Sequence, residues 1–322
     1  MQARIRWCAR LLFALSTALM SGCGKGNPVA VTGGQTGSAV EQSRVSGTLA
    51  QTSPAFEDGL MESPDPAALR SASPGGADAL IHPLHYWRRI SDVRRTFEFA
   101  FSDTDSTGRP TRAVVTIRKY LAGTFNVAFD ATPGDSTRFD SVGVVHKPLH
   151  DLWERRVLLR RVHLPAVSDD EWKLSAVSGA QVSSYDPARS TTGHLAFGST
   201  RIVRLRIQSA SGDTVIDDPL RFFLLRRIPA FGPNEDVTLT VTTMTNTDVV
   251  VLLRSGMRRR FHNNGDNTYT IFWKTSAEDG IHHIGVNALS NGTLFDDRAP
   301  YDSQAWLFPY RVKPTEVDEL LP

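Results

Sequence analysis

The sequence of 322 residues predicts an all-β protein with two β-sandwich-like domains, which follow a signal peptide and a disordered tether. Apolar and polar residues alternate from about residue 82 onward, which is the pattern of strands with one buried face. Turn-forming residues separate the alternating stretches, and the composition changes near residue 80. The expected divisions are a signal peptide (1–22), a tether (23–80), a first β domain (81–230), a second β domain (231–316) and a tail (317–322).

The N-terminus has the order of a secretory signal peptide. Three arginines precede a short apolar core from Leu11 to Met20, which is about half the ~20 residues that a membrane span needs. The residues MSGC (20–23) resemble a bacterial lipobox, where a peptidase cuts before a cysteine that carries lipid. This resemblance implies that Cys23 is the acylated first residue of the mature chain. Because Gly24 rather than aspartate follows, it also implies an envelope protein of a bacterium, anchored in the outer membrane.

Removal of the signal peptide changes the charge and the cysteine count. The whole chain has a formal net charge of +2, and losing three arginines leaves 2 − 3 = −1. Because the charge is nearly balanced, we expect no nucleic-acid partner. Cys8 leaves with the signal and Cys23 is blocked by lipid, so we expect no disulfide, zinc thiolate or cysteine nucleophile.

Residues 24–79 are rich in Gly, Ser, Thr, Ala and Pro and show no sustained apolar period. Such a segment buries too little surface to offset the entropy of ordering it. We therefore expect a disordered tether of about 55 residues, with a root-mean-square reach of roughly 40 Å. A short helix within it is expected to begin at Asp65 and Pro66, which suit the N-cap and first helical positions.

The first β domain opens with RTFEFAF, in which Phe97, Phe99 and Phe101 share one face of a strand. Arginine repeatedly occupies the polar alternate positions, which favours a solvated strand face. This part of the chain resembles no known family. Further strands are expected at RAVVTIRKY, GTFNVAFD, RRVLLRRVHL, WKLSAVSGAQVSS, TRIVRLRIQS and PLRFFLLRRI.

The second β domain follows a Pro/Gly turn cluster at residues 228–236, which predicts a domain boundary. NGDNTYTIFW (264–273) resembles the NGDGTYT hairpin of bacterial immunoglobulin-like domains, with Asn267 in place of glycine. The resemblance covers residues 233–313 and implies an immunoglobulin-like fold without catalytic residues. Six strands are expected here, at VTLTVTTMT, DVVVLLRSG, MRRRFHN, TYTIFWK, IHHIGVNAL and QAWLFPYRV.

The stretch DTDSTG (103–108) is the main candidate for a metal site. Asp103, Asp105 and Thr107 occupy alternate positions, as in the opening of a calcium loop. The twelfth position of such a loop is Val114, which cannot bind a cation, and strands rather than helices flank the stretch. We expect a turn between two strands. Calcium is the alternative, and no other cofactor is expected.

The sequence offers only weak candidates for other metal-binding, catalytic or glycan-binding sites. HKPLH carries His146 and His150 at helical spacing, but Pro148 disfavours a helix there. His282 and His283 are neighbours on an expected strand, so they point to opposite faces. Metalloprotease, nucleophile-elbow and phosphate-loop motifs are missing from the sequence. Among the tryptophans, Trp273 and Trp306 are expected in the core, and Trp87 could be exposed and stack on a sugar.

These observations favour a non-catalytic binding or structural module over an enzyme. Its expected partners are the membrane, through lipid on Cys23, and an envelope protein or glycan. The alternative is an envelope hydrolase, possibly acting on glycans, with a site assembled from distant residues in the range 82–230.

Overall fold

The computed structural model describes residues 38–69, 80–131, 142–163, 170–191, 194–199 and 202–313. Strands dominate these residues, which confirms the all-β prediction. Cys23, the expected signal peptide and the expected C-terminal tail lie outside the described residues. In the described part, no helix is long and apolar enough to span a membrane.

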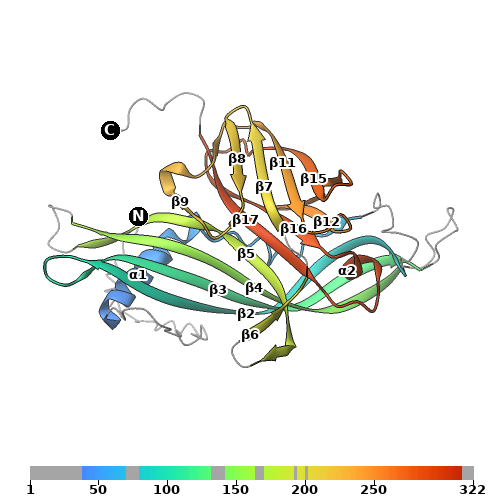
Figure 1. Ribbon diagram of the computed structural model, residues 1–322, viewed down its shortest axis with the longest axis horizontal. Coiled ribbons are helices and arrows are strands. Elements are labelled where there is room, and N and C mark those ends of the chain that lie inside the picture. The colour runs from blue at the N-terminus through green and yellow to red at the C-terminus, as the bar shows by residue number, and fades with distance from the viewer. Residues whose placement is uncertain are drawn as a thin grey trace, which may run out of the picture.

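Four long antiparallel strands lie next to one another in a large sheet and run along the length of the molecule (Figure 1). They are β2 (His82–Thr104), β3 (Pro110–Asp130), β4 (Val142–Val162) and β5 (Glu171–Thr191). The two strands expected at RAVVTIRKY and GTFNVAFD are one strand, β3. A side chain at Gly123 would collide with the carbonyl oxygen of Arg89, so glycine lets β2 approach β3 where the register shifts between Ile90 and Asp92.

The large sheet continues beyond β5 into the C-terminal strands. Its order is β1-β2-β3-β4-β5-β17-β16-β12-β13, and it has twelve strands among the described residues when β6, β9 and β10 are included. The further strands are β1 (Ala67–Ala68), β6 (His194–Phe197), β9 (Phe222–Leu224), β10 (Ala230–Phe231), β12 (Val249–Arg254), β13 (Met257–Arg260), β16 (Gly280–Leu289) and β17 (Ser303–Val312). The short helix α2 (Asn291–Phe295) connects β16 to β17.

A second sheet lies beside the C-terminal strands, in the upper part of Figure 1. Its order is β14-β15-β11-β7-β8. These strands are β7 (Ile202–Ser209), β8 (Gly212–Ile216), β11 (Asp236–Thr243), β14 (His262–Asn263) and β15 (Thr268–Lys274). The rings of Trp273 on β15 and Tyr310 on β17 meet edge to face at 5.1 Å, so side chains of the two sheets share a core.

The NGDN stretch makes a turn between β14 and β15, as its sequence predicts. Gly265 and Asn267 have positive φ values of 88° and 66°, the conformation for which glycine and asparagine are favoured. Asp266 Oδ1 accepts hydrogen bonds from the backbone N–H and the hydroxyl of Thr268, which hold the start of β15 against the turn. The local sequence was therefore sufficient to predict this hairpin turn.

The sheets cross the boundary expected between residues 230 and 231. Strands β7 and β8 precede that boundary, yet β7 pairs with β11 beyond it. In the other direction, β17 pairs with β5 from Gln304 with Ser183 to Leu307 with Ala180. The Pro/Gly cluster at 228–236 only turns the chain from β10 into β11, because turn residues report a local reversal and not the long-range pairing of strands.

The expectation of a disordered tether is wrong for residues 38–69, which we call the strap. The strap contains α1 (Ala39–Thr52), the 3-10 helix η1 (Ser53–Ala55) and β1. Ser38 caps α1, since its Oγ accepts a hydrogen bond from the N–H of Glu41 at 3.3 Å. Val45 and Leu49, four residues apart on α1, are buried. The helix expected from Asp65 does not form, because the chain there is extended and β1 pairs with β2.

Buried ion pairs join the strap to the large sheet, in addition to strap side chains such as Phe56, Met61 and Leu69 that are buried in the core. The strap carries five acidic side chains and one basic side chain, a formal charge of −4. Its carboxylates pair with sheet cations whose side chains are at most 4 % exposed. These pairs are Glu41–Arg161 (2.6 Å), Glu57–Lys119 (2.7 Å), Glu62–Lys119 (2.9 Å) and Asp58–Arg155 (3.2 Å). Removing one member of such a pair while the strap stays in place would leave the other charge buried and uncompensated, which is costly.

Candidate functional site

The DTDSTG stretch is the hairpin turn between β2 and β3, as predicted. Asp105 Oδ1 accepts hydrogen bonds from Thr107 N at 2.8 Å, Thr107 Oγ1 at 2.6 Å and Arg109 N at 3.0 Å. These bonds lower the pKa of Asp105 to about 2. Asp103 and Gly108 have positive φ values of 51° and 78° and complete the turn. Whether Asp103, Asp105 and Thr107 also bind calcium stays a prediction.

The histidines are held by separate partners. His146 Nδ1 lies 2.6 Å from Asn126 Oδ1, and both residues are on strands, not on a helix. The ring of His282 stacks on Tyr310, whereas His283 is half-buried, its Nε2 has no hydrogen-bond partner in the described chain, and burial lowers its pKa to about 3. Within the described ranges, no three His, Cys, Asp or Glu side chains are grouped so that they could hold a metal ion.

Two tryptophans lie in the core, as the sequence predicts. Trp273 and Trp306 are 5 % and 3 % exposed and belong to the core. Trp87 is half-buried on β2 and stacks on His85, with ring centroids 5.5 Å apart. Trp87 lines none of the three hollows found among the described residues.

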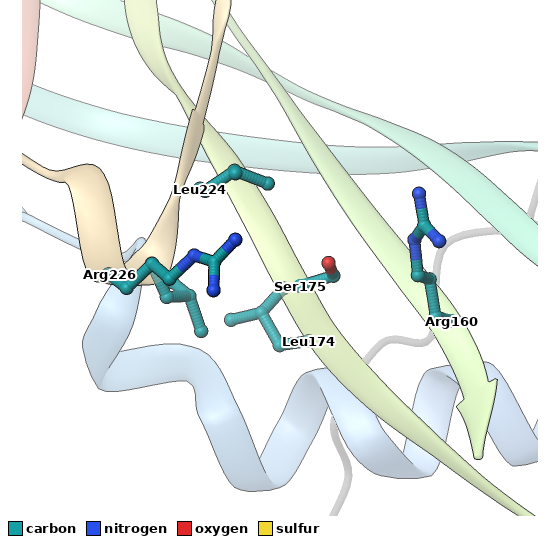
Figure 2. Close-up of a pocket in the computed structure, with 6 residues that line it drawn as sticks. Arg160, Leu174, Ser175, Leu224 and Arg226 are labelled. Carbon is teal, nitrogen blue, oxygen red and sulfur yellow. The ribbon is translucent and has the colours of Figure 1, made fainter. Parts of the chain in front are cut away.

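Two adjoining hollows lie along β5 and meet at Leu174 and Leu225. The basic hollow is a cavity of about 460 Å³. The apolar hollow is about 670 Å³ and lies between the strap, β5 and Ile281 of β16. The basic hollow is lined by Arg160, Leu174, Ser175, Leu224, Leu225 and Arg226 (Figure 2). We call the two hollows together the β5 groove.

The groove exists because β9 pairs with β5 over only three residues, Ala176 to Ser178. Ser175 is an extra residue in β5, since Leu158 and Leu159 on β4 oppose Ala176 and Leu174. Such a bulge bends a strand and ends regular pairing. After β9 the chain leaves the sheet and forms the 3-10 helix η2 (Leu225–Arg227). The strand expected over PLRFFLLRRI is therefore wrong except at Phe222–Leu224.

The groove carries more cations than carboxylates. Arg160 and Arg226 are exposed, and neither has a hydrogen bond or ion-pair partner among the residues that the structure describes. Arg160 lies directly opposite Arg112 on β3 and Lys173 on β5. Like charges at directly opposed positions destabilise a sheet. Arg112 Nε is also buried without a hydrogen-bond partner, and in the described chain the only ion pair of this row joins Lys173 to Glu171, at 3.9 Å.

The floor of the groove is apolar. Leu174, Leu224 and Leu225 are half-buried, and Ile281 is 40 % exposed. Figure 2 shows Arg160 and Arg226 on opposite sides of Leu174 and Ser175. Over both hollows the lining contains three cations and one carboxylate, Glu171, for a net charge of +2. An apolar floor beneath cations is suited to hold a molecule that is partly apolar and negatively charged.

The basic hollow has no arrangement for acid–base chemistry. Ser175 is the one hydroxyl among its described lining residues, and no carboxylate or histidine lines the hollow to accept its proton. The buried carboxylate of Asp151 is a separate cluster: it pairs with Arg88 and lies 3.2 Å from the hydroxyl of Tyr301. Asp151 is 0 % exposed and Arg88 contacts Met61 of the strap, so this cluster is closed to a substrate.

The sequence did not reveal this groove. Arg160 and Arg226 are far apart in the chain and are brought together only by the pairing of β9 with β5. The one sequence signal was the excess of arginine at polar strand positions, which is equally typical of a solvated face. Comparison with protein-family models, curated proteins and solved structures finds no match to this chain.

Proposed function

We propose that this chain is a lipid-anchored protein of the bacterial cell envelope that acts as a non-catalytic binding module, with the β5 groove as its binding site. The observation that carries this proposal is the groove itself: an apolar floor beneath Arg160 and Arg226, which no described carboxylate neutralises. A binding site needs such complementary groups and no reacting pair. Neither a catalytic residue nor a resident cofactor is part of the proposal.

The anchor is inferred from the lipobox resemblance at residues 20–23. Fourteen residues separate Cys23 from Ser38, where the strap begins. Even fully extended, such a segment spans at most about 50 Å. The proposed anchor would therefore keep the groove beside α1 close to the membrane, where it could receive an envelope component.

Cell fractionation tests the anchor. We expect Cys23→Ser to move the protein from the membrane fraction to the soluble fraction and to abolish its labelling by radioactive palmitate. Cys8→Ser is the matched control, because Cys8 lies in the segment that is expected to be removed. Unchanged labelling of the Cys23→Ser protein would contradict the anchor.

Native mass spectrometry of the Cys23→Ser protein, purified from its own cells without detergent, tests the binding role. We expect a non-covalent small-molecule adduct that is lost when Arg160→Gln and Arg226→Gln are added. An adduct that survives both changes would place the binding site elsewhere. The alternative, a glycan-directed hydrolase with a site in residues 82–230, instead predicts that envelope glycans are shortened when incubated with the protein.

A further inference from the structure

We infer that the β5 groove takes an anionic amphiphile, with a carboxylate or phosphate head between Arg160 and Arg226 and an aliphatic body that extends over Leu174 and Leu225 into the apolar hollow. The inference rests on the proposed binding function, and it names the class of ligand that the same site would hold.

The head group follows from the charges. A guanidinium donates paired hydrogen bonds to a carboxylate or phosphate, and here two guanidiniums flank one hollow (Figure 2). Arg112, Arg160 and Lys173 repel one another across β3, β4 and β5. In the described chain the only ion pair in this row joins Lys173 to Glu171, at 3.9 Å. An anion bound at Arg160 would relieve the repulsion that the protein leaves uncompensated.

The aliphatic body follows from the shape and lining of the groove. The two hollows, of about 460 and 670 Å³, share Leu174 and Leu225, so one ligand can occupy both. Each volume is within the range of small-molecule sites. The apolar hollow is bounded by Pro54, Ala55 and Ile281, which expose hydrocarbon, and its one lining cation, Lys173, is paired with Glu171 at 3.9 Å. A ligand that is charged at one end and apolar at the other fits a basic hollow that opens into an apolar one.

The same features disfavour two other occupants. A nucleic acid or nucleotide would need an aromatic surface for stacking, but Trp172 is 5 % exposed and its Nε1 is bonded to Glu41. A small inorganic anion would use the arginines and leave the apolar floor in water. Both occupants are therefore included as outcomes of the test.

Calorimetric titration of the full chain carrying Cys23→Ser, below the micelle concentration of each probe, tests the inference. The probes are dodecyl phosphate, dodecyl maltoside, inorganic phosphate and adenosine monophosphate. We expect dodecyl phosphate to bind at least tenfold more tightly than each of the other three. Dodecyl maltoside has the alkyl chain without the negative charge, and inorganic phosphate has the charge without the alkyl chain.

Paired variants locate the site. Arg160→Gln with Arg226→Gln should weaken dodecyl phosphate binding at least tenfold. The matched control, Arg89→Gln with Arg227→Gln, removes the same charge from exposed positions outside the groove lining and should leave the affinity unchanged. An equal loss of affinity in both variants would mean that only the net charge of the protein matters, and it would contradict the proposed binding site. Equal affinity for dodecyl maltoside, inorganic phosphate or adenosine monophosphate would overturn the ligand class. A natural adduct of another chemistry would then leave the binding function standing.

Discussion

At the scale of single residues, Asp248 is the buried carboxyl group whose environment gives the clearest pH dependence. It is 6 % exposed in the loop before β12, and its Oδ2 has no hydrogen-bond partner in the described chain. Burial is the main cause that raises the pKa of Asp248 to about 6, and the charge of Asp302 adds to it. Hydrogen bonds from Thr245 and Thr243 act in the opposite direction.

We predict that Asp248→Asn stabilises the protein at pH 7.5 by at most about 3 kcal/mol, since the pKa is raised by about two units from 3.8. A raised carboxyl pKa means that the folded state binds the proton more tightly. The ionised group therefore costs stability above pH 6, and the cost disappears as the pH falls through 6 toward 3.8. Urea unfolding at pH 7.5 and pH 4 measures the difference, which should fall below about 1 kcal/mol at pH 4.

The control for this prediction is Asp279→Asn, which changes an exposed carboxyl group in the loop before β16. It should alter the free energy of unfolding little at either pH. If Asp248→Asn had the same effect at pH 7.5 and pH 4, the change would come from packing or from the denatured state and not from the ionised carboxyl group.

Single residues also show which features the sequence can predict. The alternation of Phe97, Phe99 and Phe101 predicted one shared face, and the rings of Phe99 and Phe101 do stack, 6.3 Å apart. Side-chain alternation depends only on the local backbone. The role of Arg160 depends instead on Lys173 and Arg226, which strand pairing brings near it. The groove could not be predicted for that reason.

At the scale of elements, the strap was the largest error of the sequence analysis. Its polar, small-residue composition predicts disorder, and Val45 and Leu49 form only a short apolar stripe on α1. The strap is ordered because side chains such as Phe56 and Met61 join the core and because its carboxylates pair with buried cations on the large sheet. Complementary charge on a distant element is not visible in the composition of the segment itself.

We predict that Arg155 and Asp58 are strongly coupled. Arg155→Met should cost about 3–5 kcal/mol of folding free energy, because it leaves the Asp58 carboxyl group buried without its cation. Asp58→Leu should have a comparable cost, and the double variant should lose clearly less than the sum of the two. Urea unfolding of the four proteins gives the coupling energy.

The matched control for this cycle is the pair Arg204 and Asp217, whose side chains are 57 % and 59 % exposed. An exposed pair of this kind contributes less than about 1 kcal/mol. Hydrogen exchange adds a local readout, since α1 should lose protection in Arg155→Met if the ion pair holds the strap. Additive losses in the Arg155 and Asp58 cycle would contradict the role assigned to their pairing.

At the scale of the whole molecule, two features connect the parts that the sequence analysis separated. The large sheet is continuous through the pairing of β5 with β17. The strap spans the same junction: α1 packs on β5, and Arg258 of β13 donates hydrogen bonds to backbone carbonyls at Leu60, Ser63 and Asp65. Strand candidates were largely predictable from local alternation, whereas this order of strands was not, because pairing partners are distant in the chain.

We predict that the segment 231–316 does not fold by itself, because it lacks β7 and β8 and would expose the edge of β11 that pairs with β7. Thermal melts followed by circular dichroism should show no cooperative transition for this segment. The control segment 202–316 restores β7 and β8 and should regain a cooperative transition. Its melting temperature should lie below that of the full chain, since β17 has lost its pairing with β5. A cooperative melt of 231–316 near the full-chain temperature would instead establish an independent domain beginning at residue 231.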